Sequence, residues 1–309
     1  MSYKRKLRPV PPLTQIELPG LEPIYRGKVR DIYQVSDKHF LMVASDRLSA
    51  FDVVFPVGIT DKGKILTRIS NHWFSLIDVV PNHLRETHCL NFPEPFSKYC
   101  HILEDRSCLV RKCQRIDVEC VVRGYLMGSA YEEYQKHQKV AGEPMPSSLA
   151  PGAKLPYAVF SPAIKKNKGH DENISFAELK KIIGEELAQK LRDISLSIYH
   201  LASKLLETKG ILLLDTKFEF GFYNEKLILI DELLTPDSSR YCLAEDYEKA
   251  LKEKKFPPTL DKQIIRDYLI QMGWRGQSPI PPLPEEILEK TRQRYQFMEE
   301  TILCLTKPT

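Results

Sequence analysis

Residues 211–232 read ILLLDTKFEFGFYNEKLILIDE, two apolar runs that each end in carboxylates. Successive side chains of an extended strand alternate between its two faces, so the even-numbered residues of 212–222 share one largely apolar face. The odd-numbered face begins apolar and then presents Asp215, Lys217 and Glu219. This run therefore predicts a strand with one face in the core and with charged groups along part of the other.

The second run, residues 226–230, is apolar on both faces and stops at Asp231 and Glu232, while "GFYN" before it predicts a hairpin turn. The hairpin would place Glu219 beside Asp231, where two unpaired carboxylates repel each other and lose solvation. A Mg²⁺ ion would resolve that conflict, because it binds one or two carboxylates together with substrate phosphates. The alternative is a solvated strand end with Lys217 in a local ion pair.

Composition narrows the function classes. The chain has 309 residues, 42% of them hydrophobic and 28% charged, with a net charge of +4. This length suffices for one large core or two adjoining cores, and no basic block suits DNA or RNA. No run approaches the ~20 apolar residues that span a membrane. We therefore expect a globular protein without nucleic acid or membrane as a partner, as a monomer or simple homo-oligomer.

The N-terminus and the cysteines bear on localisation. "MSYKRKLRPVPP" is basic and proline-rich and has no apolar signal segment, so residues 1–15 are expected to form a mobile basic arm. The seven cysteines are an odd number without a C-x-x-C pair, which argues against a disulfide framework and a zinc site. A reducing cytoplasm fits both features best.

Periodicity and capping signals predict the remaining elements. The expected strand pairs are 25–35 with 39–45 and 108–113 with 116–123. The expected helices are 64–79, one near "GSAYEEYQK", one from the capping box "SFAE" to "ETKG", and 285–305. Residues 142–162, rich in Pro, Ala and Ser, are expected to be irregular. We place a domain boundary near Ile116, with an N-terminal α+β lobe at 16–115 and a larger α+β domain at 116–309.

Three cations, Arg26, Lys28 and Arg30, lie on one face of "YRGKVRDIY". Gly27 has no Cβ, so the backbone there can approach a phosphate closely, and a hairpin of this kind can cover a nucleoside triphosphate. It is not a Walker A loop, because G-x-x-x-x-G-K-[ST] is absent from the sequence. The alternative interpretation is a solvated cationic strand face.

Polar loop residues follow several predicted strands. Asp46 and Ser49 in "SDRLSAFDVVF" are candidates for a site, although a capped turn explains them equally well. Arg123 ends a strand just before Ser129, and "TPDSSRYC" follows the second carboxylate strand. An arginine with nearby serine hydroxyls suits a phosphomonoester. Alternatively, Arg123 forms an ion pair with Glu119 or Glu132.

One polar block lacks periodicity. In "FSPAIKKNKGHDENISF", residues 160–176, the side chains of Lys165, His170, Asp171 and Glu172 would serve a site, or the last of them would simply begin a helix. Both interpretations stay open at this point.

Six ordered motifs resemble the SAICAR synthetase family, phosphoribosylaminoimidazole-succinocarboxamide synthases: RGKVRDIY, SDRLSAFD, VVRGYLMGSA, GHDENIS, DTKFEFGF and IDELLTPDSSR. The resemblance covers about residues 24–268. It implies a purine-biosynthesis ligase that converts ATP, the carboxylated aminoimidazole ribonucleotide (CAIR) and L-aspartate into SAICAR, ADP and phosphate, with Mg²⁺ required. The implied fold is α+β, with a kinase-like N-terminal lobe and an ATP-grasp-like second domain.

The resemblance also implies residue roles. Lys28 and Arg30, with Gly27 between strand and turn, would bind ATP, and Glu219 and Asp231 would bind Mg²⁺. Arg123, Ser129 and Arg240 would bind the ribonucleotide, and Asp215 and Lys217 would line the catalytic cleft. Three further residues are added as substrate-binding candidates because of their loop positions: Asp46, Ser49 and Asp237.

Two positions depart from the family pattern. Ala163 stands where many relatives have a small hydroxyl residue, which puts a hydroxyl contact there in doubt. "TLDKQ" at 259–263 stands where relatives often read SYDKQ or SFDKQ, so this region is not assigned to the site.

The reaction that the resemblance implies explains why the predicted site is rich in cationic groups. A carboxylate is a poor acyl donor to an amine, and phosphoryl transfer from ATP converts it to an acyl phosphate. Donor and acceptor are both anions, so the site needs cations: Mg²⁺, Lys28, Arg30 and Lys217. A kinase would also need a cationic hairpin and a paired-carboxylate metal site, but the H-R-D-x-x-x-x-N and D-F-G signatures of protein kinases are absent from the sequence. An RNA-binding module is disfavoured by acids between the aromatics and by the small net charge.

Overall fold

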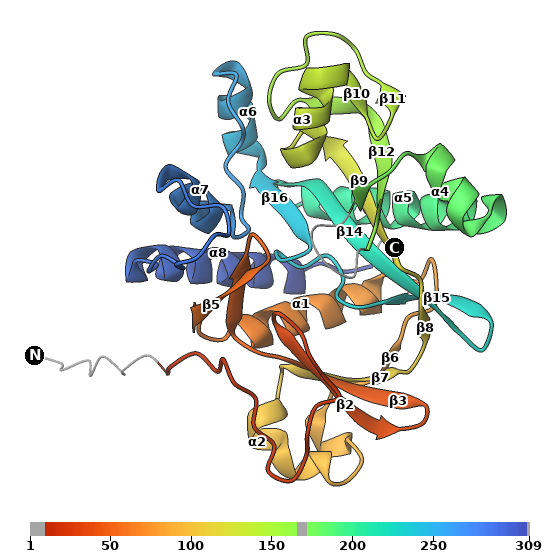
Figure 1. Ribbon diagram of the computed structural model, residues 1–309, viewed down its shortest axis with the longest axis vertical. Helices are drawn as coiled ribbons and strands as arrows, with labels where there is room; N and C mark the ends of the chain where they lie inside the picture. Colours follow the sequence, from red (N-terminus) through yellow and green to blue (C-terminus); the bar gives the residue numbers. More distant parts are fainter. Residues whose placement is uncertain (1–9, 166–171, 308–309) are drawn as a thin grey trace, which may run out of the picture.

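Two antiparallel sheets organise the computed structural model, which describes residues 10–165 and 172–307 (Figure 1). The smaller sheet comes from the N-terminal chain and has the order β1-β2-β3-β7-β6. Its strands are β1 (Tyr25–Arg26), β2 (Arg30–Ser36), β3 (His39–Ala44), β7 (Ser107–Arg111) and β6 (Leu84–Glu86). The predicted N-terminal hairpin is confirmed, with a turn at residues 27–29 that interrupts its first strand.

The larger sheet has the order β13-β12-β9-β14-β15, and β16 and β8 also pair with β14. Its strands are β13 (Glu172–Asn173), β12 (Lys154–Ile164), β9 (Val118–Tyr125), β14 (Ile211–Tyr223), β15 (Lys226–Ile230), β16 (Ser239–Leu243) and β8 (Gln114–Arg115). The hairpin predicted at 211–232 is therefore confirmed, and Asn224 and Glu225 make its turn with φ values of 48° and 61°.

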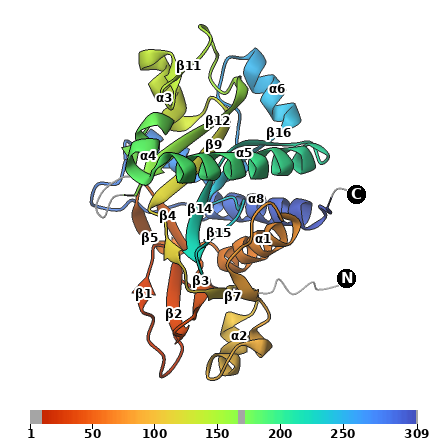
Figure 2. The same ribbon diagram turned by 90° about the vertical axis from the view of Figure 1, so that its right-hand side faces the viewer.

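Three long helices pack against the sheets or against one another. α5 (Glu185–Glu207) contacts β9, β12 and β14 and lies along one face of the larger sheet (Figure 2). α1 (Lys62–Leu76) packs against α8 (Glu285–Leu303) and also contacts β3 and β7. Ile65, Ile69 and Trp73 of α1 are buried at a spacing of four residues, as an amphipathic helix requires.

Shorter elements complete the chain. The helices are α2 (Cys100–Leu103), α3 (Gly128–His137), α4 (Phe176–Ile183), α6 (Ala244–Lys252) and α7 (Gln263–Gln271), with 3₁₀ turns at Cys89–Asn91 and Phe96–Tyr99. Two separate hairpins are β4 (Arg47–Ala50) with β5 (Val53–Gly58) and β10 (Lys139–Val140) with β11 (Glu143–Pro144). Within the described ranges, no helix is long and apolar enough to cross a membrane.

The structure corrects two predictions about strands. The runs predicted as a pair at 108–113 and 116–123 are β7 and β9, which belong to different sheets because the chain crosses from one sheet to the other between them. The region 142–162, predicted to be irregular, contributes much of β12, because pairing with β9 satisfies its backbone in spite of two prolines in β12.

Two further corrections concern a helix and the cysteines. The long helix predicted after "SFAE" begins at the expected capping box but breaks at Gly184, where φ is 86°, into α4 and α5. Cys89 and Cys100 form a disulfide with Cα atoms 5.2 Å apart, against the expectation from the cysteine count. Local spacing did not reveal this pair, because the intervening 3₁₀ turns fold the chain back on itself.

Part of the predicted N-terminal arm packs against the fold. Residues 1–9 of the predicted arm lie outside the described residues, whereas Leu13 is docked: its amide donates to the side-chain carboxylate of Asp46, and its carbonyl oxygen accepts from the Asp46 amide. The boundary near Ile116 stays a prediction. One apolar core crosses it, since Trp73 and Phe218 belong to the same buried cluster.

Candidate functional site

A cavity of about 1070 Å³ is lined by residues of both sheets. Its wall includes most residues predicted from the sequence: Gly27, Lys28, Arg30, Ser49, Arg123, Asp215, Lys217, Glu219, Asp231, Asp237 and Arg240. Ser129 is outside the lining but contacts it, because its hydroxyl lies 3.1 Å from Nη2 of Arg123. The structure therefore gathers residues that are up to about 200 positions apart in the chain.

Two arginines flank one carboxylate at the first subsite. In the sheet register Asp215 of β14 lies opposite Arg123 of β9 on one side and Arg240 of β16 on the other. Its carboxylate oxygens are 3.4 Å from Nη1 of Arg123 and 3.1 Å from Nε of Arg240. Burial lowers the pKa of the Arg123 guanidinium in spite of Asp215, so a further anion there would be stabilised strongly. The expected partners of Arg123, Glu119 or Glu132, are not its ion-pair partners here.

A glycine makes room for the second arginine. Gly128 begins α3 with φ of +53°, and a Cβ on it would lie 2.7 Å from Nη2 of Arg240. The sequence "GSA" thus combines space for a guanidinium with the hydroxyl of Ser129 at a helix start. Two cationic forks and a hydroxyl on one patch form a suitable receptor for a phosphomonoester.

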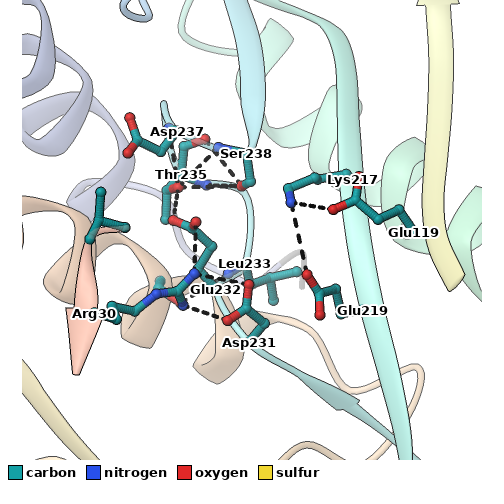
Figure 3. Close-up of polar contacts among 12 residues, drawn as sticks. Arg30, Glu119, Lys217, Glu219, Asp231, Glu232, Leu233, Thr235, Asp237 and Ser238 are labelled. Atoms are coloured by element: carbon teal, nitrogen blue, oxygen red, sulfur yellow. Dashed lines mark hydrogen bonds and ion pairs between the residues drawn. The ribbon is translucent and has the colours of Figure 1, made fainter. Parts of the chain in front are cut away.

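Two lysines and two glutamates form a second cluster beside the first. Lys217 Nζ is 2.7 Å from Oε1 of Glu119 and 3.8 Å from Oε1 of Glu219 (Figure 3). Lys165 Nζ is 2.7 Å from the same Glu219 oxygen and 3.4 Å from that of Glu119. Burial opposes the positive charge on Lys217. The neighbouring carboxylates of Glu119 and Glu219 nevertheless raise its pKa, so it stays a cation.

The N-terminal sheet contributes a third group. Arg30 of β2 binds Asp231 through Nη1 at 2.6 Å and reaches Glu232 through Nη2 at 3.1 Å (Figure 3). Asp231 follows β15 directly, and its φ of 65° turns the chain out of the strand. Burial raises the pKa of the Asp231 carboxyl, but Arg30 and Lys217 outweigh it and hold the pKa below its ordinary value.

The residues present fit a magnesium ion that phosphates help to bind. Among the described residues, no three His, Cys, Asp or Glu side chains gather as a metal cluster. The carboxylates of Glu219 and Asp231 do lie near each other (Figure 3), and burial and the charge of Asp231 raise the pKa of Glu219. A pair of hard oxygen donors under mutual repulsion matches the Mg²⁺ pattern of one or two carboxylates completed by substrate phosphates. Here Lys165 and Arg30 neutralise the pair instead.

Asp237 lies at another part of the wall and is deeply anchored. Its carboxylate is 2.7 Å from Lys62 Nζ and 3.4 Å from Lys262 Nζ, and it accepts a 2.7 Å hydrogen bond from Tyr295. Burial opposes ionisation, but both lysines hold the pKa of Asp237 well below its ordinary value. Asp237 therefore joins α1, α8 and the segment before α7 and has little capacity left for a substrate.

The remaining predicted residues divide between the cavity and the core. Ser49 lines the cavity, and Lys28 lines it while pairing with Asp52. Asp46 is 2% exposed and does not line this cavity. It accepts hydrogen bonds from the amides of Leu13 and Gly63 and from Arg106. These contacts favour the capped-turn alternative for Asp46, and its substrate role stays a prediction.

Sequence reasoning missed several wall residues: Glu119, Lys165 as a partner of Glu219, Lys262 and Arg266. A signal existed for Glu119, because Glu119 and Arg123 lie on the same face of β9 at a period of two. Lys262 sits in the "TLDKQ" segment that was left unassigned, while Ala163 is buried in β12 and does not line the cavity. His170 and Asp171 lie outside the described residues.

Apolar side chains of both sheets line another part of the cavity: Ile32, Met42, Val110 and Ile230. Arg30 and Lys28 also line the cavity. Apolar walls with convergent cations suit a flat heterocycle bearing phosphates.

Comparison with known proteins agrees with this chemistry. A family model described as SAICAR synthetase matches residues 23–281. The phosphoribosylaminoimidazole-succinocarboxamide synthase of Thermodesulfovibrio yellowstonii is 52% identical over 283 residues, 91% of this chain and 95% of that protein. The synthase of that name from Leptospira interrogans is 50% identical over 286 residues, 93% of this chain and 98% of that protein.

Solved structures share the fold. A SAICAR synthase from Saccharomyces cerevisiae, described in complex with SAICAR, matches with a TM-score of 0.83 and 37% identity over 96% of this chain and 99% of that one. A SAICAR synthetase described in complex with ADP matches with a TM-score of 0.66 and 22% identity, over 92% and 99% of the two chains. The α+β fold expected from the sequence is thereby confirmed.

Proposed function

The chain belongs to the SAICAR synthetase family, and from that premise we propose how its cavity performs the reaction. As an enzyme of this family, it joins L-aspartate to the carboxylate of CAIR in purine biosynthesis. The proposal concerns the steps and the residues: ATP use through an acyl phosphate, and a place in the cavity for each substrate. All partners are small metabolites, which favours the cytoplasm and requires neither nucleic acid nor membrane.

The ribonucleotide phosphate is assigned to Arg123, Arg240 and Ser129. These side chains offer two guanidinium groups and a hydroxyl on one patch, and Asp215 holds both arginines. A phosphate dianion would replace part of the Asp215 contact and gain charge-assisted hydrogen bonds from both forks. This assignment leaves the CAIR carboxylate free to reach the neighbouring Lys217 cluster.

ATP is assigned to the wall that comes from the N-terminal sheet. The adenine would lie among Ile32, Met42 and Val110, and the phosphates would lie beneath the turn that holds Gly27 and Lys28. A Cβ on Gly27 would lie 2.9 Å from the Arg30 carbonyl oxygen, so only glycine permits this tight turn. The nucleotide and the ribonucleotide then meet at the Lys–Glu cluster.

Glu219 and Asp231 would hold Mg²⁺. When bound, the ion would neutralise negative charge on the transferring phosphoryl group and on the leaving ADP. The chain's own groups complete the charge balance: Lys217 is held as a cation beside Glu219, and Arg30 is released from Asp231 toward the phosphates.

The proposed reaction has two steps, and in each of them one bond forms as another breaks. A carboxylate oxygen of CAIR attacks the γ-phosphorus, and the bond from that phosphorus to the β,γ-bridging oxygen breaks, which releases ADP. The amine of aspartate then attacks the acyl carbon, the acyl C–O bond breaks with release of phosphate, and the amine gives up a proton. Lys217 stabilises the charge on the acyl oxygens through electrostatic preorganisation.

L-Aspartate is assigned to the wall near Lys262 and Arg266. Both side chains line the cavity together with Ser238 and Arg240. Aspartate carries two carboxylates, so its pocket needs cations in addition to those used by the phosphates. Lys262 shares its partner Asp237 with Lys62, and Arg266 is 3.6 Å from Asp261, so neither cation is fully neutralised by a close contact of its own.

One observation supports this function above the others: Asp215 sets two arginines next to the Lys217–Glu219 cluster, which places an acceptor's phosphate site beside a phosphoryl-transfer site. The test uses CAIR labelled with ¹⁸O in its carboxylate. An acyl phosphate requires one labelled oxygen to appear in inorganic phosphate, detected by mass spectrometry, as SAICAR forms. Unlabelled phosphate with SAICAR would refute the acyl phosphate, and a phosphorylated product without SAICAR would indicate a kinase.

A further inference from the structure

Arg47 of β4 binds the turn at residues 27–29 from behind. Its Nη2 donates to the carbonyl oxygen of Gly27 at 3.1 Å, and its Nε donates to the carbonyl oxygen of Lys28 at 3.1 Å. A third nitrogen, Nη1, donates to the carbonyl of Thr14 at 3.0 Å. One guanidinium therefore holds two consecutive carbonyls of the turn and ties them to the N-terminal segment.

A buried acid holds this arginine. Asp31 of β2 is fully buried, and its Oδ1 is 2.6 Å from Nη2 of Arg47. Its other oxygen, Oδ2, has no hydrogen-bond partner in the described part of the chain. Arg47 is thus the hydrogen-bonded counter-charge of this buried side chain, which makes the arginine position well determined.

A third carbonyl of the turn is held on the same side. The carbonyl oxygen of Val29 accepts hydrogen bonds from the amide of Ser45 at 2.9 Å and from its hydroxyl at 2.8 Å. Ser45 and Arg47 are two positions apart in the sequence, so one short segment binds the carbonyls of Gly27, Lys28 and Val29.

The amides of this turn must then face the other way. In a planar trans peptide, the C=O and N–H point in opposite directions. The N–H of Lys28 shares a peptide with the Gly27 carbonyl, and the N–H of Val29 shares one with the Lys28 carbonyl. Both N–H groups therefore point away from Arg47, and among residues 10–165 and 172–307 neither has an acceptor.

The cavity lies on that side. Gly27, Lys28 and Val29 line it, whereas Arg47 does not. Two successive unbonded amides in a turn form a concavity that binds anions. We propose that Arg47 is a positioning residue: by binding the Gly27 and Lys28 carbonyls it presents the amides of Lys28 and Val29 to a phosphate of the nucleotide. This inference rests on the proposed function, because it requires a nucleotide in the cavity.

The test compares two ligands that differ only in their phosphates. Isothermal titration calorimetry without Mg²⁺ measures ADP and adenosine binding to the wild type and to Arg47→Lys, which keeps the charge near Asp31 but loses the fork. We expect ADP affinity to fall about 10- to 100-fold, as for charge-assisted hydrogen bonds, with adenosine affinity within about twofold. If Arg47→Lys does not fold, the double variant Asp31→Asn/Arg47→Gln removes both buried charges and is measured instead.

A matched control separates positioning from stability. Arg106→Lys alters another buried arginine, which pairs with Asp46 and the Ala44 carbonyl but does not touch the turn, so its ADP-to-adenosine affinity ratio should stay at the wild-type value. Unchanged ADP affinity in Arg47→Lys, or equal losses for both ligands, would overturn the inference alone. A wild type that binds ADP no better than adenosine would overturn the proposed nucleotide site as well.

Discussion

Arg30 holds Asp231 with two nitrogens, Nη1 at 2.6 Å from Oδ1 and Nη2 at 2.9 Å from Oδ2. The two residues are 201 positions apart, and their contact joins the N-terminal sheet to the end of β15 across the cavity. The arginine assigned to phosphates and the carboxylate assigned to metal thus satisfy each other. If both assignments hold, ligand binding breaks the Arg30–Asp231 ion pair and gives each residue a new partner. Substitution of either residue should therefore affect activity strongly.

The metal assignment predicts a loss of turnover in Glu219→Gln and Asp231→Asn. Each variant should lose about two orders of magnitude or more in kcat, because a donor that stabilises transition-state charge is removed. Unfolding free energy should change by only about 1–2 kcal/mol, since Arg30 keeps Glu232 and asparagine tolerates the positive φ at 231. Unchanged turnover at limiting Mg²⁺ in both variants would remove the assignment.

The ribonucleotide site predicts a selective effect on CAIR. Arg240→Ala and Arg123→Ala should raise the KM for CAIR about 10- to 100-fold, because each contact to a phosphate contributes roughly 1.5–3 kcal/mol. The KM for ATP should change far less. Arg115→Ala is the matched control, since Arg115 lines the cavity but pairs with the exposed Asp117. A change confined to the ATP constant would mean that the two subsites are exchanged.

Gly128→Ala should reproduce the Arg240 effect without removing a charge. The added Cβ would meet the Arg240 guanidinium at 2.7 Å, so the arginine must shift and the KM for CAIR should rise several-fold. Gly142→Ala has a comparable φ of +80° and meets only Ser175, at 3.3 Å, so its backbone cost is similar. Steady-state kinetics that show equal CAIR constants in both variants would contradict the assignment.

Lys217→Met tests the central cation. We expect kcat to fall about 100-fold, since Lys217 faces the developing charge, with smaller changes in the three substrate KM values. Stability should be affected little, because Lys165 still pairs with both Glu119 and Glu219. Lys226→Met on exposed β15 surface serves as the control. If Lys217→Met turned over at the wild-type rate, Lys217 would have no part in the chemistry.

The ion pairs that Asp237 makes with Lys62 and Lys262 predict a contribution to stability that depends on pH. Its folded-state pKa lies below the ordinary value of 3.8, so its contribution is complete above pH 3.8 and is lost as the pH falls through the folded-state value. Asp237→Asn should cost about 3–5 kcal/mol at pH 7, because it leaves Lys62 and Lys262 without a buried counter-charge. Denaturant unfolding should show this difference shrinking below about pH 3.8.

Asp246→Asn, whose half-buried side chain pairs with the exposed Lys249 at 3.6 Å, is the control and should change stability by less than about 1 kcal/mol at any pH. A difference between wild type and Asp237→Asn that stays constant down to pH 3 would show that the Asp237 carboxylate is not held ionised by its lysines.

Local order could be predicted from the sequence because it depends on neighbours. The period-two pattern from Ile211 predicted β14, and the turn residues before Lys226 predicted its hairpin with β15. The same alternation put Glu219 near Asp231, since hairpin register follows from the position of the turn. The motif around Arg123 and Ser129 likewise predicted that these two side chains lie together, because the two residues are only six positions apart.

Tertiary structure alone decided how these local pieces meet. Asp215 lies between Arg123 and Arg240 because β9 and β16 both pair with β14, a register that no local pattern encodes. Asp46 faced the core and Lys262 the cavity for the same reason, since a loop residue's surroundings depend on which distant segment packs against it. Periodicity acts through residues a few positions apart, whereas Arg30 and Asp231 are brought together only when burial of the shared core closes the chain between them.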